Sequence, residues 1–94
     1  MSVYISLLKF TTKGAAAMNK SVKRAREFNR AAKKAGVTIL GQYWTLGAYD
    51  GVLVLGAKKP DNALRCIAEL VAGGNVTAET LTAYNDKQFQ KMME

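Results

Sequence analysis

The sequence predicts an α+β fold of the ferredoxin-like type, in which a βαββαβ chain forms a four-stranded antiparallel sheet with two helices on one face. Three observations predict it. Segments with the period of strands and segments with the period of helices follow one another in this order. A short segment bounded by glycines, residues 47–51, joins strands two and three and favours an antiparallel hairpin. The length of 94 residues leaves room for one core, so we expect a single domain over residues 1–94.

The first strand and the first helix are separated by a change of hydrophobic period. Residues 3–10 are rich in β-branched and aromatic side chains and predict a strand. Over residues 13–35 apolar side chains recur at about 100° per residue, which predicts an amphipathic helix closed by Gly36. Ser21 is a candidate N-cap where this helix divides into a short leading turn and a longer body. The apolar arc of the helix consists of Met18, Val22, Ala25, Phe28, Ala32 and Ala35.

Strands two and three are apolar on both faces. Residues 37–46 predict strand two and residues 52–55 strand three. Strict alternation along strand two sets Val37, Ile39 and Tyr43 on one face and Leu40, Trp44 and Leu46 on the other. A sheet with one solvated face would alternate apolar and polar residues, so we expect a second copy of the chain to bury the face without helices. Two sheets packed face to face form a two-fold homodimer, from which a higher oligomer could be built.

The second half of the chain supplies the remaining helix and strand. Pro60 suits the first turn of a helix that ends at the glycine pair 73–74. Its expected buried stripe is Leu64, Ile67, Ala68 and Val71, and Cys66 beside the stripe is expected to be a buried, inert thiol. Residues 76–84 predict strand four, and residues 86–94 predict a short C-terminal helix.

Three segments carry a resemblance to a known family: residues 4–11 (YISLLKFT), 43–51 (YWTLGAYDG) and 74–81 (GNVTAETL). With them the chain resembles the GYD domain family of the dimeric α/β-barrel superfamily, over essentially its whole length. The resemblance implies the ferredoxin-like fold and a dimeric α/β barrel, and it implies no established activity. Members of the superfamily include small monooxygenases, muconolactone isomerases and ligand-binding regulatory modules, many of which use a cleft between sheet and helices. Such likeness is weak evidence for chemistry.

Composition limits the chemistry that the chain can perform. It contains one cysteine and no histidine, which excludes an internal disulfide, the usual zinc ligand sets and a Ser–His or Cys–His nucleophilic pair. We therefore expect neither a metal nor a cofactor. The chain enters a strand directly, without a leader pattern, and has no apolar run of about 18 residues, so we expect a cytoplasmic protein with no membrane partner.

Tyr49 and Asp50 are the candidate catalytic residues. Asp50 is the one acidic residue between Glu27 and Asp61 and begins an otherwise apolar strand. Partial burial would raise its pKa and make it a general acid or base, with Tyr49 as a hydrogen-bond donor to a substrate oxygen. The alternative is structural: an aspartate between glycines commonly accepts backbone N–H groups in its own turn, and we favour this interpretation.

Four further residues are candidate ligand contacts. Tyr4, Tyr43 and Trp44 could form the wall of a pocket for a flat organic ligand, or could pack in the core or the dimer interface. Packing is the more common role for large aromatic side chains. Lys9 could pair with Asp50 or with an anionic ligand, or could project from the end of its strand, which is the commoner fate of a lysine.

The net charge of +7 comes largely from one helix. Eight of the fourteen Lys and Arg residues lie between Lys13 and Lys34, where Glu27 is the only acid. Such a stripe could bind phosphates at low salt. No aromatic residue is interleaved on the charged arc, so we favour a solvated helix face over a nucleic-acid site.

These observations lead to one functional expectation and two alternatives. We expect a homodimer that binds a small organic molecule, or transforms it without a cofactor, in a cleft between sheet and helices near Tyr49 and Asp50. One alternative is a non-catalytic assembly or regulatory module, in which the oligomer itself is the functional object. The other is weak nucleic-acid binding through the basic helix. Composition does not decide whether the protein is an enzyme.

Overall fold

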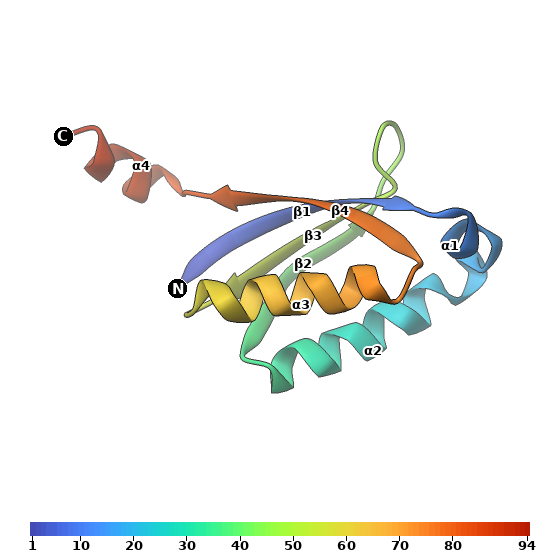
Figure 1. Ribbon diagram of the computed structural model, residues 1–94. Helices are drawn as coiled ribbons and strands as arrows, with labels where there is room; N and C mark the ends of the chain where they lie inside the picture. Colours follow the sequence, from blue (N-terminus) through green and yellow to red (C-terminus); the bar gives the residue numbers. More distant parts are fainter.

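The predicted element order and sheet are confirmed in the computed structural model, which describes residues 1–94. The four strands form one antiparallel sheet in the order β2-β3-β1-β4, so β1 and β3 are central (Figure 1). The elements in chain order are β1 (Ser2–Phe10), α1 (Thr12–Ala16), a 3-10 turn (Met18–Lys20), α2 (Ser21–Lys34), β2 (Val37–Trp44), β3 (Gly51–Ala57), α3 (Pro60–Ala72), β4 (Val76–Ala83) and α4 (Asp86–Met92). None of the helices is both long and apolar enough to cross a membrane.

The hydrophobic core lies between the sheet and the pair α2 and α3, which cover one face of the sheet (Figure 1). Its buried residues are Ala32, Val37, Leu53, Leu55, Ala57, Ala63, Cys66 and Ile67. One polar side chain, Ser6, is completely buried on β1. Its hydroxyl lies 2.7 Å from that of Thr80 on β4, and this hydrogen bond offsets the cost of burying it.

The first helical region begins and divides as predicted, but not through the predicted cap. The Thr11 hydroxyl accepts a hydrogen bond from the N–H of Gly14 and caps α1. A 3-10 turn then precedes α2, whose first residue is Ser21. The prediction that Ser21 is an N-cap is wrong, because Ser21 already has helical backbone angles (φ −60°, ψ −42°) and the N-cap position is Lys20, whose side chain makes no capping bond. The Ser21 hydroxyl instead accepts a hydrogen bond from the indole N–H of Trp44 at 2.9 Å. Gly36 ends the region with φ +82°, as predicted.

The buried face of α2 is narrower than the predicted apolar arc, and the buried face of α3 is displaced from it. Within the predicted arc only Ala32 is fully buried, and Ala25 and Phe28 are half-buried. Val22 on α2, Met18 in the preceding 3-10 turn and Ala35 after the helix are exposed. On α3 the core contacts are Ala63, Cys66, Ile67 and Leu70, whereas the predicted Leu64, Ala68 and Val71 are exposed, Leu64 by 72%. The helix is thus rotated by about one residue, or roughly 100°. The small side chains of Ala63 and Cys66 allow α3 to pack closely on the sheet.

A β-bulge in β2 reverses the predicted alternation. Ile39 pairs with Leu55, but Gly41 pairs with Val54, so Leu40 is an extra residue in the ladder. Beyond this point every side chain of β2 changes face. Gln42 and Trp44 therefore lie on the helix face with Val37 and Ile39, and Leu40 and Tyr43 lie on the opposite face. The prediction that grouped Tyr43 with Val37, and Trp44 with Leu40, is wrong for this reason. The strand also ends at Trp44 and not at Leu46.

The sheet face opposite α2 and α3, here called the open face, carries no element of the chain (Figure 1). The strand registers place nine apolar side chains on it: Val3, Ile5 and Leu7 of β1, Val52 and Val54 of β3, Leu40 and Tyr43 of β2, and Leu81 and Ala83 of β4. Tyr43 is 62% exposed on this face. The second face is mainly apolar, as predicted, although the same registers place Lys9, Thr77 and Glu79 at one end of it. A solvated face of this composition is unusual for a sheet.

The chain leaves the sheet at the end of β4. Asn85 begins α4 through a capping box: its side chain accepts the N–H of Gln88 at 2.8 Å, and the Gln88 side chain accepts the N–H of Asn85 at 2.9 Å. The predicted C-terminal helix is therefore present. It lies beyond the end of the sheet and clear of α2 and α3 (Figure 1).

Candidate functional site

Asp50 joins the end of β1 to the β2–β3 loop. Its carboxylate oxygen Oδ2 accepts the backbone N–H of Phe10 at 2.8 Å, and its own N–H donates to the carbonyl of Leu8 at 2.8 Å. Its carbonyl accepts the N–H of Thr45 at 2.9 Å. Asp50 thus holds a backbone N–H, as the structural alternative predicts, but on the neighbouring strand and not in its own turn.

Tyr49 lies on the open-face side of the sheet, where it meets Lys9 and Glu79. The Tyr49 hydroxyl donates to the Glu79 carboxylate oxygen Oε2 at 2.6 Å, and the Lys9 ammonium lies 5.3 Å from the centre of the Tyr49 ring. The hydrogen bond to Glu79, the negative charge of Glu79 and desolvation all raise the pKa of Tyr49 above its ordinary value of 10.0. Tyr49 is therefore a neutral hydrogen-bond donor at neutral pH.

The candidate ligand contacts lie on different faces of the sheet. Tyr4 is half-buried under α3, beside a hollow of about 290 Å³. Trp44 is on the same face but at the β2 edge, where it binds Ser21. Tyr43 is on the open face, as is Lys9. Among these candidates only Lys9 lies beside a predicted catalytic residue: its ammonium is over the ring of Tyr49, on the side of the sheet away from the helices.

The cleft between sheet and helices is formed by other residues. A groove of about 400 Å³ lies between α2, α3 and the end of the sheet. Its floor is apolar and its rim is polar, with Arg24 on one side and Glu69 on the other. The floor consists of Phe10, Phe28, Leu53, Leu70 and Val76, which come from five elements of the chain. Sequence periodicity identifies some of them as apolar but does not bring them into one groove.

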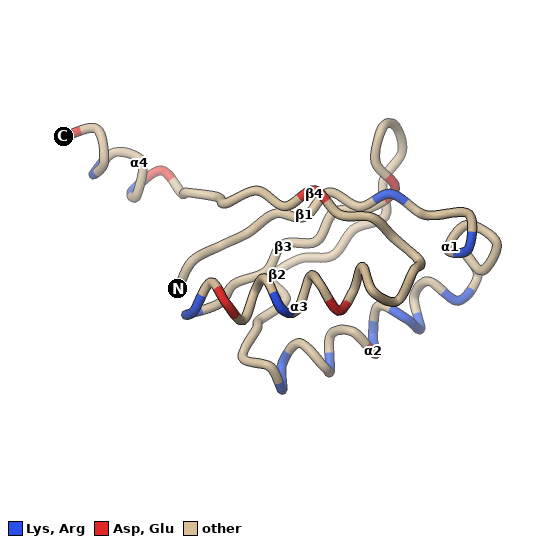
Figure 2. The backbone as a smooth tube through the Cα atoms, in the orientation of Figure 1, with Lys and Arg blue, Asp and Glu red and all other residues tan.

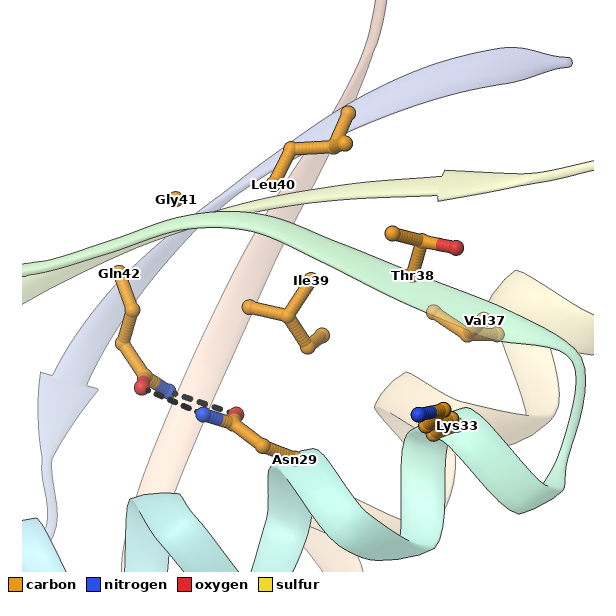
Figure 3. Close-up of a pocket in the computed structure, with 8 residues that line it drawn as sticks. All are labelled: Asn29, Lys33, Val37, Thr38, Ile39, Leu40, Gly41 and Gln42. Carbon is orange, nitrogen blue, oxygen red and sulfur yellow. Dashed lines mark hydrogen bonds between the residues drawn. The ribbon is translucent and has the colours of Figure 1, made fainter.

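A second groove, of about 510 Å³, follows the outer edge of β2 beside α2 (Figure 3). The amides of Asn29 and Gln42 exchange two hydrogen bonds, of 3.0 and 3.2 Å, and tie the helix to the strand. Figure 3 shows Ile39 pointing toward α2 and Leu40 pointing away from it, on the two sides of the bulge. The groove is open and is lined by both polar and apolar residues, and Lys33 lies along its helix side.

Cys66, the one thiol, is buried in the core under α3. Burial, with a further contribution from the charge of Glu69, raises the pKa of the Cys66 thiol. The thiolate, which is the reactive form, is therefore suppressed, as expected for an inert structural cysteine.

The fold and its surfaces define the protein as a ferredoxin-like α+β domain with one open, apolar sheet face. The model of the GYD domain matches residues 4–93, and the chain belongs to the GYD domain family. The predicted family is therefore confirmed. The fold is also that of TTHA0845 from Thermus thermophilus, whose crystal structure superposes with a TM-score of 0.59 over 90% of this chain and 95% of that chain, at 17% sequence identity.

A curated relative supplies a functional description. The chain is 33% identical over 84 residues, 88% of either protein, to the glutamine synthetase and cystathionine beta-lyase binding protein of Thermus thermophilus. The description names two enzymes as that relative's binding partners.

Proposed function

We propose that this protein is a non-catalytic binding module that works as a homodimer and docks on a metabolic enzyme. This proposal rests on the similarity to a protein whose name states which enzymes it binds, because that similarity extends over 88% of both chains. It favours the assembly or regulatory alternative over the small-molecule expectation. The bonding of Asp50 agrees with it, since that carboxylate already holds the N–H of Phe10.

The open face is the proposed dimer surface. A four-stranded face about eight residues long measures roughly 19 by 26 Å, from spacings of ~4.8 Å between strands and ~3.3 Å per residue. The flat area of this face is about 500 Å², and the side chains that protrude from it make its accessible area larger. That accessible area is comparable to the ~800 Å² that each partner buries in a standard stable interface. Burying nine apolar side chains against a second copy would remove the largest apolar surface of the sheet from water.

The enzyme partner needs a surface that the dimer leaves free. The outward side of the helix layer remains accessible when the open faces meet. Basic residues recur along the whole of α2 (Figure 2), with Glu27 as the one acid in the helix. We propose that this basic face of α2 contacts an acidic surface of the enzyme, because opposite potentials accelerate and orient docking.

Binding to a purified enzyme tests the proposal. The first probe is glutamine synthetase from the organism that encodes this protein, and the second is its cystathionine beta-lyase. Each enzyme is titrated by biolayer interferometry at about 50 mM salt. Arg26→Glu/Arg30→Glu should weaken binding at least tenfold, because both exposed charges lie on α2. Lys58→Glu/Lys59→Glu is the matched control, with the same charge change in the exposed turn before α3. Equal effects of the two variants would contradict the α2 surface, and no binding of the wild type to either enzyme would contradict the proposed partner.

The basic face of α2 also allows the nucleic-acid alternative to be tested with the same variants. Binding to duplex DNA or RNA would have to fall steeply with salt and disappear in Arg26→Glu/Arg30→Glu. Absence of binding at about 50 mM salt would exclude this alternative.

A small-molecule site in the groove between α2 and α3 is the second candidate function. Its supporting observation is the apolar floor between Arg24 and Glu69, which suits a compact organic ligand with a polar group at its rim. Thermal-shift screening of small aromatic, hydroxy-acid and keto-acid compounds tests it. A ligand that raises Tm in the wild type and not in Leu70→Glu would support the groove. A screen without any stabilising ligand would contradict it.

A further inference from the structure

The C-terminal arm, residues 84–94, has no surface to pack on within its own chain. Every residue of the arm is exposed, and α4 lies beyond the end of β4 (Figure 1). Four large hydrophobic side chains are among them: Tyr84 is 58%, Phe89 57%, Met92 51% and Met93 66% exposed. A segment that remains in solvent would not be expected to expose several large hydrophobic side chains together.

The arm is nevertheless constructed as an amphipathic helix. Phe89, Met92 and Met93 are spaced at i, i+3 and i+4, which brings them onto one side of α4. The charges of Lys87 and Lys91 fall on the opposite side at about 100° per residue. Asn85 and Gln88 form a complete capping box at the N-terminus. The helix therefore has a defined start and a defined apolar stripe.

A helix of this length needs a tertiary contact. α4 spans seven residues, whereas isolated helices shorter than about 12–15 residues are marginal in water. The GYD domain match extends to residue 93, so the arm belongs to the domain. The stripe of Phe89, Met92 and Met93 is then expected to be covered in the functional state of the protein.

The geometry of the arm directs it away from its own sheet. Tyr84 alone lies between the last residue of β4 and the N-cap Asn85, and the Asn85 backbone is extended. Such a short connection leads α4 onward from the sheet end, as Figure 1 shows. Within β4, Leu81 and Ala83 point to the open face. The arm is thus a direct continuation of the proposed dimer surface.

We propose that α4 of each protomer crosses to the other and packs its apolar stripe against the partner subunit. The inference rests on the proposed homodimer and adds a second, exchanged contact to it. A partner stacked on the open face lies next to the exit point of β4, where no part of the protomer's own chain is available. Two-fold symmetry makes both arms equivalent, so each dimer contains two such contacts.

Spin labelling in mixed dimers tests where the arm lies. Gln90→Cys places a thiol on α4 outside the apolar stripe, and buried Cys66 leaves it as the reactive one. The spin-labelled chain is mixed with isotope-labelled wild-type chain, and only the amide signals of the wild-type chain are recorded. We expect one contiguous group of these signals to be broadened. A dimer with no broadened signals, or with broadening that appears only after an enzyme partner is added, would overturn the inference.

Truncation and light scattering separate this inference from the proposed dimer. Removal of residues 84–94 and the variant Phe89→Ala/Met92→Ala should each weaken dimerisation at least tenfold. The control Lys87→Ala/Lys91→Ala, on the opposite side of α4, should leave it within twofold. Unchanged dimerisation after truncation would overturn the exchanged arm while the dimer stands. A wild-type protein that is monomeric at micromolar concentration would overturn the dimer itself.

Discussion

Replacement of Asp50 by alanine removes the carboxylate oxygen that accepts the N–H of Phe10 at 2.8 Å. A hydrogen bond to a charged group contributes about 1.5–3 kcal/mol, and a partly buried N–H left without an acceptor adds to the loss. We expect Asp50→Ala to lower the free energy of unfolding by about 2 kcal/mol. For a domain of this size that corresponds to a fall in Tm of roughly 8–16 °C. Asp50→Asn retains a carbonyl acceptor, so its loss should be about 1 kcal/mol.

Thermal and urea unfolding, followed by circular dichroism and Trp44 fluorescence at one fixed protomer concentration, measure these differences. Asp61→Ala is the control, because Asp61 is exposed in the first turn of α3 and should cost no more than about 1 kcal/mol. Stability of Asp50→Ala within about 0.5 kcal/mol of the wild type would refute the structural role. So would an unchanged Tm in Asp50→Asn combined with complete loss of partner or ligand binding, which would restore the functional interpretation of this carboxylate.

Three further predictions follow from named contacts. Ultraviolet titration should give Tyr49 a pKa above its ordinary value in the wild type and a lower pKa in Glu79→Gln. The stability that the Tyr49–Glu79 hydrogen bond contributes is present below pH 10.0 and is lost as the pH rises through the raised pKa of Tyr49. Identical titrations of the two proteins would contradict this hydrogen bond. Val54→Asp on the open face should yield monomers in light scattering, whereas Arg65→Asp on α3 should not, and a dimeric Val54→Asp variant would exclude this face as the interface. Gly36→Ala should lower the free energy of unfolding by about 1 kcal/mol, since φ is +82° and a Cβ would lie 3.0 Å from the Asn62 side chain, and an unchanged urea midpoint would contradict it.

The order of strands and helices could be predicted because it depends on local patterns. Residues 3–10 and 76–84 carry the composition of strands, and Pro60 and Gly36 mark a helix start and a helix end through their own backbone preferences. The apolar composition of both sides of strand two was also sufficient to predict an open, apolar face. Each of these features is encoded within a short stretch of chain.

The predictions that failed depended on how elements pack. The bulge at Leu40 is defined by the pairing of β2 with β3, and it moved Tyr43 and Trp44 to opposite faces from those expected. The orientation of α3 follows from close packing on the sheet, where Ala63 and Cys66 fit and Leu64 does not. The contact of Ser21 with Trp44 joins residues 23 positions apart, so the local sequence around Ser21 could not indicate it.

By itself the sequence determined the GYD-type βαββαβ domain, its basic α2 and its apolar second sheet face, because periodicity, caps and composition are local properties. Only the tertiary structure determined which residues Tyr49 and Asp50 contact. It bonded Asp50 to Phe10, 40 positions away, and Tyr49 to Glu79, 30 positions away, on the side opposite the helices. It also left α4 without a covering surface. These are consequences of strand register and loop direction, which arise when segments distant in sequence pair and pack.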